Sequence, residues 1–235
     1  KDWIVSGSDE GFYPPVSTYL EEAEIFFAHE YKKENIPVDA DVIVIGKNAK
    51  LVAETNEEVR AAYESGIRVC SFPDMLEELT RETDNIVVVG SYGKSTTTAL
   101  LAWCLKSTGK DPNYFIGEIT RGFAGHAGLG TSGTFVLEGD EYPSSNTDSS
   151  PKFLHYNATS ILLTSATHDH VNVYPTHADY LAPFQKLIAS LPADGLVVAS
   201  GDEEHARALA ETYSGTTILY GMNDTNEWHP AHIHY

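Results

Sequence analysis

The segment from Ile86 to Ser95, which reads IVVVGSYGKS, constrains the fold of this chain more than any other segment. Its four apolar residues predict a buried strand, its two glycines allow a tight turn, and an apolar helix is expected from Ser95 to about Gly109. The N–H groups of such a turn and the N-terminus of the following helix attract anions, and Lys94 adds a positive charge. A strand, a glycine-rich turn and a helix in this order therefore predict a phosphate-binding site.

The glycine-rich turn is a short variant of a known phosphate-binding pattern. The full pattern G-x-x-x-x-G-K-[ST] is not met, because Val88 stands in place of its first glycine, whereas the shorter G-x-x-G-K-S-T is present. The alternative is an ordinary strand-to-helix turn with a chance lysine, and the flanking strand and helix favour phosphate binding. Within the turn, the Ser95 hydroxyl would ligate Mg²⁺. The predicted nucleotide-binding residues are Gly90, Ser91, Gly93, Lys94, Ser95 and Thr96.

The charge and composition of the chain exclude several functions. Its 235 residues carry a formal net charge of −19, which argues against a general affinity for nucleic acid or for an anionic membrane. The sequence has no apolar run as long as a membrane span and no recognisable signal peptide, so a cytoplasmic protein is expected. The two cysteines, Cys70 and Cys104, lack the spacing of a metal or redox site and are expected to be buried free thiols.

Strands alternate with helices along the chain, which predicts an α/β fold with parallel sheets. An acidic, polar stretch before the phosphate-binding strand places a domain boundary there, with domains at residues 1–82 and 83–235. In the first domain we expect strands at 3–9, ending in a polar turn, and at 25–28, 41–46 and 67–71, and helices at 17–24, 56–65 and 73–79. In the second we expect strands at 86–89, 134–137, 160–164, 196–200 and 216–220, and helices at 95–108, 177–191 and 203–213. The helix at 95–108 is apolar almost all round and is expected to be buried on more than one side.

Acidic residues and histidines follow two strands of the second domain. Glu138-Gly139-Asp140-Glu141-Tyr142 follows the strand at 134–137, and Thr167-His168-Asp169-His170 follows the strand at 160–164. Because the carboxyl ends of neighbouring parallel strands meet at one edge of a sheet, these groups would face the phosphate turn if the strands are neighbours. They would then form a site for a metal ion or for phosphate oxygens. The alternatives are a solvated acidic loop and a pair of surface histidines.

These motifs, in this order, resemble the Mur ligase family, whose members use ATP to join an amino acid or a peptide to a UDP-muramyl substrate. The matching segments are GSYGKSTT at 90–97, EGDEY at 138–142, and THDH at 167–170 with Tyr174-Pro175 behind it. The opening segments VSGSD at 5–9 and YPPVST at 13–18 look most like the branch that joins the murein tripeptide to UDP-N-acetylmuramate. The branch that adds L-alanine is also similar.

The resemblance implies a Rossmann-like UDP-sugar-binding domain without its first strand, followed by an incomplete ATP-binding P-loop domain. A third domain, which in the family brings the amine, would be absent. By the resemblance, Lys94 would hold the ATP phosphates, Ser95 and Glu138 one Mg²⁺, and His170 a second Mg²⁺. The UDP-sugar site would include Asp9, Ser17 and Lys152. The muramyl carboxylate would be phosphorylated by ATP, and the amine would attack the acyl phosphate; we expect this chain alone to bind Mg-ATP without turning it over.

The chain departs from the family pattern at four positions. The family usually has Thr and His where Ser91 and Tyr92 stand, and often Asn and Glu where Thr164 and Thr167 stand. One alternative is therefore a nucleotide-binding module without catalytic activity. Another is a different ligase of the family, of the folylpolyglutamate or cyanophycin type, against which the expected UDP-binding domain argues.

Overall fold

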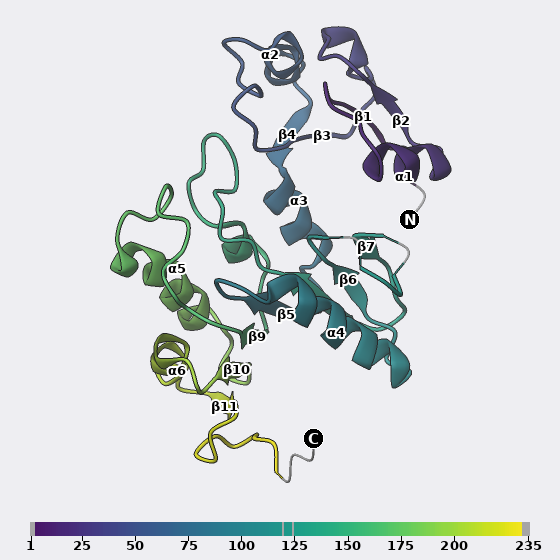
Figure 1. The fold of residues 1–235 in the computed structure, drawn as a ribbon. Coiled ribbons are helices and arrows are strands. Elements are labelled where there is room, and N and C mark those ends of the chain that lie inside the picture. Colours follow the sequence, from purple (N-terminus) through teal and green to yellow (C-terminus); the bar gives the residue numbers. More distant parts are fainter. Residues whose placement is uncertain (1–2, 119, 124, 232–235) are drawn as a thin grey trace. The chain divides into compact units, whose positions relative to one another are not determined.

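The computed structural model describes residues 3–118, 120–123 and 125–231 (Figure 1). The chain divides into two compact units, of which the first comprises Lys1–Met75 and Ser144–Ser149. The second comprises Leu76–Pro143 and Ser150–Tyr235. The domain boundary between residues 82 and 83 stays a prediction, because a division by contacts does not by itself fix where a domain begins.

The first unit contains two parallel strand pairs and short helices. In chain order its elements are β1 (Ser6–Ser8), α1 (Val16–Glu22), β2 (Phe26–Ala28), η1 (Lys33–Asn35), β3 (Val42–Ile45), α2 (Glu57–Glu64) and β4 (Arg68–Ser71). β1 pairs with β2, and β3 pairs with β4. Helix α2 begins after Asn56, whose side chain accepts a hydrogen bond from the Val59 N–H at 3.0 Å. The strand expected at 3–9 is confirmed in part: β1 lies within it, but pairing with β2 begins only at Ser6.

The second unit is built on one mixed sheet. Helix α3 (Phe72–Leu79) leads into it and is followed by β5 (Asp84–Val89), α4 (Lys94–Ser107), β6 (Asn113–Phe115), β7 (Ala127–Gly128), β8 (Thr134–Glu138), η2 (Lys152–His155), β9 (Ser160–Leu163), α5 (His177–Ala189), β10 (Leu196–Ser200), α6 (Glu204–Ala210) and β11 (Thr216–Tyr220). The strand order is β11-β10-β9-β5-β8-β6-β7, and all pairs are parallel except β6 with β7. The expected α/β class is confirmed. Within the described residues, no helix combines the length and the apolar character that a membrane span needs.

Helices cover both faces of this sheet (Figure 1). Successive side chains of a strand point to opposite faces, so Val87 and Val89 join a large core with α5 and α6, whereas Val136 joins a small core beneath α4. The large core includes Tyr180, Phe184, Leu187, Ala206 and Leu209. The small core consists of Ala102, Tyr114, Ile116 and Val136, with four partly buried neighbours.

The prediction that α4 is buried on more than one side is wrong. Thr98 and Ala102, one helical turn apart, face the protein, whereas Leu100 is 57% exposed and Trp103 is 52% exposed. The small core beneath α4 offers contacts to one face of the helix only. Cys104 of this helix is exposed and Cys70 is half-buried, so the expectation of two buried thiols is also wrong.

The phenol of Tyr156 provides a test of how the large core is stabilised. Tyr156 is fully buried, burial raises its pKa, and its hydroxyl has no hydrogen-bond partner among the described residues. Because a buried hydroxyl without a partner contributes no stability, Tyr156→Phe should leave the free energy of unfolding unchanged or raise it by about 1 kcal/mol. Urea denaturation measures this change.

Tyr180→Phe is the matched control, because the equally buried Tyr180 hydroxyl donates to Ser91 Oγ at 3.0 Å. Losing that bond should lower the free energy of unfolding by about 1 kcal/mol. An equal loss of unfolding free energy in Tyr156→Phe and Tyr180→Phe would contradict the expectation that only the Tyr180 hydroxyl stabilises the fold.

Candidate active site at the phosphate-binding turn

The turn between β5 and α4 is shaped by its glycines and packed against the segment after β9. Gly90 has φ +139°, and a Cβ built there would lie 2.2 Å from Thr164 Oγ1 and 2.8 Å from Ser165 N. Ser165 Oγ accepts hydrogen bonds from the N–H groups of Ser91 at 3.1 Å and Tyr92 at 3.3 Å. Two N–H groups of the turn are therefore bonded to the protein itself.

The N–H groups left for an anion lie at the start of α4. Gly93 caps this helix with φ +80°, and the described residues supply no side-chain cap. The first N–H groups of a helix have no acceptor within the helix, and the helix dipole makes this end positive. The region from Gly93 to Thr96 thus forms an anion-binding helix N-terminus, next to the side chain of Lys94.

The Lys94 ammonium is held at the turn by the protein. It donates to the Gly90 carbonyl at 2.8 Å and to Glu141 Oε1 at 2.9 Å. The same Glu141 oxygen lies 2.7 Å from His170 Nε2. The Tyr142 hydroxyl lies 3.0 Å from His170 Nδ1, so a neutral ring that donates from Nε2 and accepts at Nδ1 satisfies both contacts. Glu141 is thus a shared acceptor for a lysine and a histidine.

Glu138 and Ser95 form a pair of oxygen ligands of the kind that Mg²⁺ prefers. Glu138 ends β8, where it is paired in register with Val88 of β5. Its Oε1 accepts from Ser95 Oγ at 2.7 Å, and its Oε2 accepts from the Gly117 N–H at 2.6 Å. Two adjacent ligands of an octahedral Mg²⁺ lie about 3 Å apart, so this pair fits the ion with little movement. The Gly117 contact fixes the carboxylate, as outer-shell contacts do in metal sites.

The structure brings four of the predicted residues to one edge of the sheet. Lys94 and Ser95 follow β5, Glu138 ends β8, and His170 lies on the loop after β9. β5 lies between β8 and β9, so the site is at the point where the strand order reverses, which is where α/β sheets bind ligands. The metal and phosphate roles of these residues stay proposals.

Lys152 and Glu141 also lie at this edge of the sheet. Lys152 is the first residue of η2, and its ammonium forms an ion pair at 2.5 Å with Asp140 of the loop that follows β8. Glu141 received no role from its sequence, although its position three residues after Glu138 was the available signal. Its importance comes from burial: its side chain is only 3% exposed.

The residues predicted to bind the UDP-sugar, Asp9 and Ser17, lie in the first unit. Asp9 follows β1, and its carboxylate accepts from the Tyr31 hydroxyl at 2.8 Å. Ser17 lies in the first turn of α1. A hollow of about 610 Å³ in this unit is lined by Glu10, Glu30, Tyr31, Ala49, Lys50, Thr55, Asn56, Glu57 and Arg60. Asp9 is connected to this hollow through Tyr31, whereas Ser17 is not among the lining residues.

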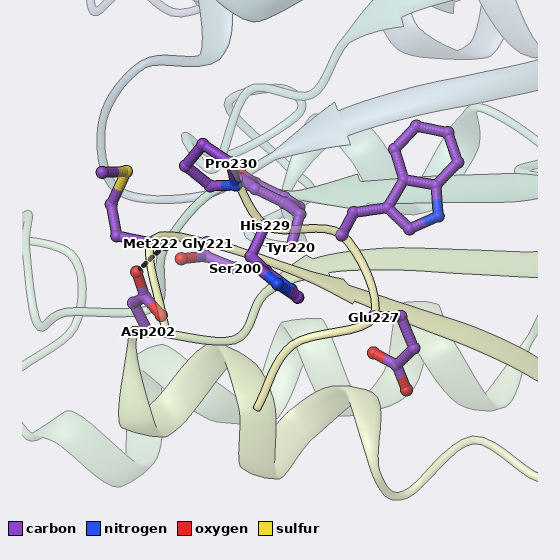
Figure 2. Close-up of a pocket in the computed structure, with 9 residues that line it drawn as sticks. Ser200, Asp202, Tyr220, Gly221, Met222, Glu227, His229 and Pro230 are labelled. Atoms are coloured by element: carbon purple, nitrogen blue, oxygen red, sulfur yellow. Dashed lines mark hydrogen bonds between the residues drawn. The ribbon is translucent and has the colours of Figure 1, made fainter. Parts of the chain in front are cut away.

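A second hollow, of about 750 Å³, lies in the second unit where β10 and β11 end (Figure 2). Its acidic residue Asp202 is not free to bind a ligand, because its carboxylate accepts from Met222 N, Asn223 N and the Asn226 side chain. These bonds hold the pKa of Asp202 below its usual value. The lining residues are Ser200, Asp202, Tyr220, Gly221, Met222, Glu227, Trp228, His229 and Pro230. We read this hollow as part of the framework that ties the loop after β11 to β10.

Residues 88–235 match the family model described as the Mur ligase middle domain. The chain belongs to the Mur ligase family. The match begins within β5. It includes every residue of the glycine-rich turn and of the segments EGDEY at 138–142 and THDH at 167–170. The glycine-rich turn and Glu138 therefore both lie within the matched residues.

Two kinds of named ligase are among the curated relatives of this Mur ligase chain. It is 33% identical to the UDP-N-acetylmuramate–L-alanyl-gamma-D-glutamyl-meso-2,6-diaminoheptandioate ligase of Haemophilus influenzae, over 97% of the chain and 50% of that protein. It is 35% identical to the UDP-N-acetylmuramate–L-alanine ligase of Paenarthrobacter aurescens, over 94% of the chain and 46% of that protein. The chain therefore spans about half the length of these curated relatives.

A solved structure shares the fold of most of the chain. The UDP-N-acetylmuramate:L-alanyl-gamma-D-glutamyl-meso-diaminopimelate ligase from Neisseria meningitides superposes with a TM-score of 0.81 and 29% identity. The superposition covers 92% of this chain and 70% of that one. The similarity thus extends beyond the middle domain into the first unit.

Proposed function

We propose that this chain is the nucleotide- and UDP-sugar-binding part of an ATP-dependent ligase of peptidoglycan synthesis or recycling. The ligase would phosphorylate the carboxylate of UDP-N-acetylmuramate and join the resulting acyl phosphate to an amino acid or to the murein tripeptide. The observation that carries this proposal is the convergence of Lys94, Ser95 and Glu138 at one sheet edge, with Ser95 Oγ 2.7 Å from Glu138. Both groups of named relatives act on UDP-N-acetylmuramate, which supports the substrate.

The residues of the turn would each act on the ATP phosphates in a distinct way. The N–H groups from Gly93 to Thr96 would donate to phosphate oxygens, and Lys94 would neutralise their charge. Ser95, Glu138 and His170 would hold Mg²⁺, which stabilises the negative charge that moves during phosphoryl transfer. The hydroxyl and carboxylate of the first two are hard oxygen ligands, as this ion requires.

The first unit would supply contacts to the UDP-sugar. Asp9 at the end of β1 is placed to accept hydrogen bonds from a ribose or a base, as acidic residues at strand ends do in α/β sheets. Lys50 and Arg60 line the adjacent hollow together with three glutamates, and Lys50 forms an ion pair with Glu10. A diphosphate would therefore have to compete with Glu10 for Lys50. Ser17 and Lys152 are further proposed contacts, Lys152 for the sugar or its carboxylate.

The four departures from the family pattern are compatible with an intact turn. Thr164 Oγ1 donates to the Tyr92 carbonyl at 2.7 Å, and Thr167 Oγ1 lies 3.1 Å from the Tyr92 hydroxyl. Ser91 Oγ donates to the Thr167 carbonyl at 2.5 Å. The substituted residues thus bond to one another. The turn is therefore intact, as a ligase requires, although a module that only binds nucleotide would require it as well.

Replacing Glu138 tests the metal site that the proposal requires. Glu138→Gln keeps the shape and one acceptor for Ser95 but removes the charge, so Mg²⁺ should lose most of its effect on ATP binding. We expect the affinity for ATP in excess Mg²⁺ to fall about tenfold or more, since contacts to charged groups contribute about 1.5–3 kcal/mol. Titration calorimetry with and without Mg²⁺ measures this effect.

Asp169→Asn is the matched control for Glu138→Gln. Its carboxylate lies at the same sheet edge, accepts a hydrogen bond at 2.7 Å from the His170 N–H next in sequence, and lies 3.8 Å from His170 Nε2. We expect a change of about twofold or less. An equal loss in both variants would show a general charge effect. Phosphate release by the full-length ligase with UDP-N-acetylmuramate, ATP and either L-alanine or the tripeptide then separates the two named activities. No release by the full-length protein with any amine would favour the non-catalytic module.

A further inference from the structure

Glu141 is a buried carboxylate with an unusual set of contacts. Its side chain is 3% exposed, and one oxygen, Oε1, accepts from both Lys94 and His170. The other oxygen, Oε2, is buried and has no hydrogen-bond partner among the described residues. The Tyr174 hydroxyl donates to the Glu141 carbonyl at 2.5 Å and holds the backbone in place. A carboxylate in this environment is stable only while a cation neutralises it.

Lys94 supplies that cation in the structure, and each of its N–H donors already faces an acceptor. An ammonium has three N–H donors. Those of Lys94 face the Gly90 carbonyl at 2.8 Å, the Ser91 carbonyl at 3.5 Å and Glu141 at 2.9 Å. A phosphate that recruits Lys94 must therefore take it from one of these acceptors. Glu141 is the charged one, so losing the ammonium would leave its carboxylate buried and unpaired.

We propose that Glu141 exchanges cations: it pairs with Lys94 before nucleotide binds, then passes Lys94 to phosphate and takes a divalent cation together with His170. This rests on the proposed nucleotide site. Glu141 Oε1 and His170 Nε2 are 2.7 Å apart, close to the roughly 3 Å between adjacent ligands of an octahedral ion. His170 would ligate through Nε2 as the other neutral tautomer, with its proton on Nδ1, where the Tyr142 hydroxyl lies 3.0 Å away and accepts it in a hydrogen bond. The unpartnered Oε2 offers a second ligand atom. Glu141 thereby makes nucleotide binding depend on the divalent cation, because metal-free ATP meets an unneutralised carboxylate.

The first test compares ATP binding by wild type and Glu141→Gln, in EDTA and in excess Mg²⁺, by titration calorimetry. The variant frees Lys94 and removes the repulsive charge. Its metal-free affinity should therefore rise about fivefold or more, and the gain that Mg²⁺ gives should fall about tenfold. Asp140→Asn removes the same charge one residue away, where the partner is Lys152, and should change the Mg²⁺ gain by about twofold or less.

The second test uses Mn²⁺ as the probe and needs no nucleotide. In Lys94→Ala, Glu141 has lost its ammonium, so Mn²⁺ should bind about fivefold more tightly than to wild type, as measured by the spin resonance of free Mn²⁺. This test stays decisive if Glu141→Gln does not fold. Unchanged or weaker Mn²⁺ binding to Lys94→Ala would overturn the cation exchange, as would a Glu141→Gln variant with the wild-type Mg²⁺ gain. If wild type does not bind Mg-ATP, the proposed nucleotide site itself is wrong.

Discussion

Replacing Lys94 by alanine should lower the affinity of the chain for Mg-ATP at least about tenfold. The ammonium lies at the N-terminus of α4, against the carbonyl of Gly90, and is the basic group that the turn itself provides. A charge-assisted contact contributes about 1.5–3 kcal/mol, and about 1.4 kcal/mol corresponds to a factor of ten in the dissociation constant. Titration calorimetry with ATP in excess Mg²⁺ measures the loss.

Lys152→Ala is the matched control for this prediction. Both lysines pair with carboxylates of the loop after β8, and Lys152 is 23% exposed against 15% for Lys94. Only Lys94 lies on the glycine-rich turn, so Lys152→Ala should change the ATP affinity by about twofold or less. An affinity of Lys94→Ala within about threefold of wild type would contradict a phosphate role for this residue.

The location of the site at one sheet edge could be predicted because the residues that follow the strands of a parallel sheet lie at the same edge, however far apart they are in the sequence. The strands β5, β8 and β9 are short apolar runs, and each is followed by chemically active residues. Once the three are assigned to one parallel sheet, their carboxyl ends must meet at one edge. The rule predicts that Ser95 and Glu138 lie near one another if β5 and β8 are neighbours; the pairing of these strands and the contact itself come from the structure.

The prediction about helix α4 was wrong for a different reason, because burial depends on how much protein covers each face of a helix. The apolar residues of α4 predicted burial all round, but the core beneath this helix is small and leaves Leu100 and Trp103 exposed. Strand β6 comes just before the glycine-rich stretch from Gly117 to Gly133, and strand β7 lies within it; the sequence predicted neither strand. Glu141 looked like one more acid of an acidic loop. Its burial between Lys94 and His170 depends on three segments that only the folded chain brings together.

Replacing Gly90 by alanine should destabilise the second unit by about 2–6 kcal/mol. Alanine rarely adopts φ +139°, and such strain costs about 1–3 kcal/mol. The new methyl group would also meet Thr164 Oγ1 at 2.2 Å and the backbone N and O of Ser165 at 2.8 Å. The Thr164 side chain is able to rotate away, but the Ser165 backbone is fixed next to β9, and overpacking of this kind adds about 1–3 kcal/mol.

The other positive-φ glycines of this region allow the two causes to be separated. Gly93 and Gly109 both have φ +80°, and a Cβ at either would meet no atom of the described residues within 4 Å. Alanine there should cost only the backbone strain, about 1–2 kcal/mol. Urea denaturation of the three variants measures the difference. If Gly90→Ala proved no less stable than Gly93→Ala, the close approach of Ser165 would not be what requires glycine at position 90, and the packing of the turn against the segment after β9 would have to be looser than the structure shows.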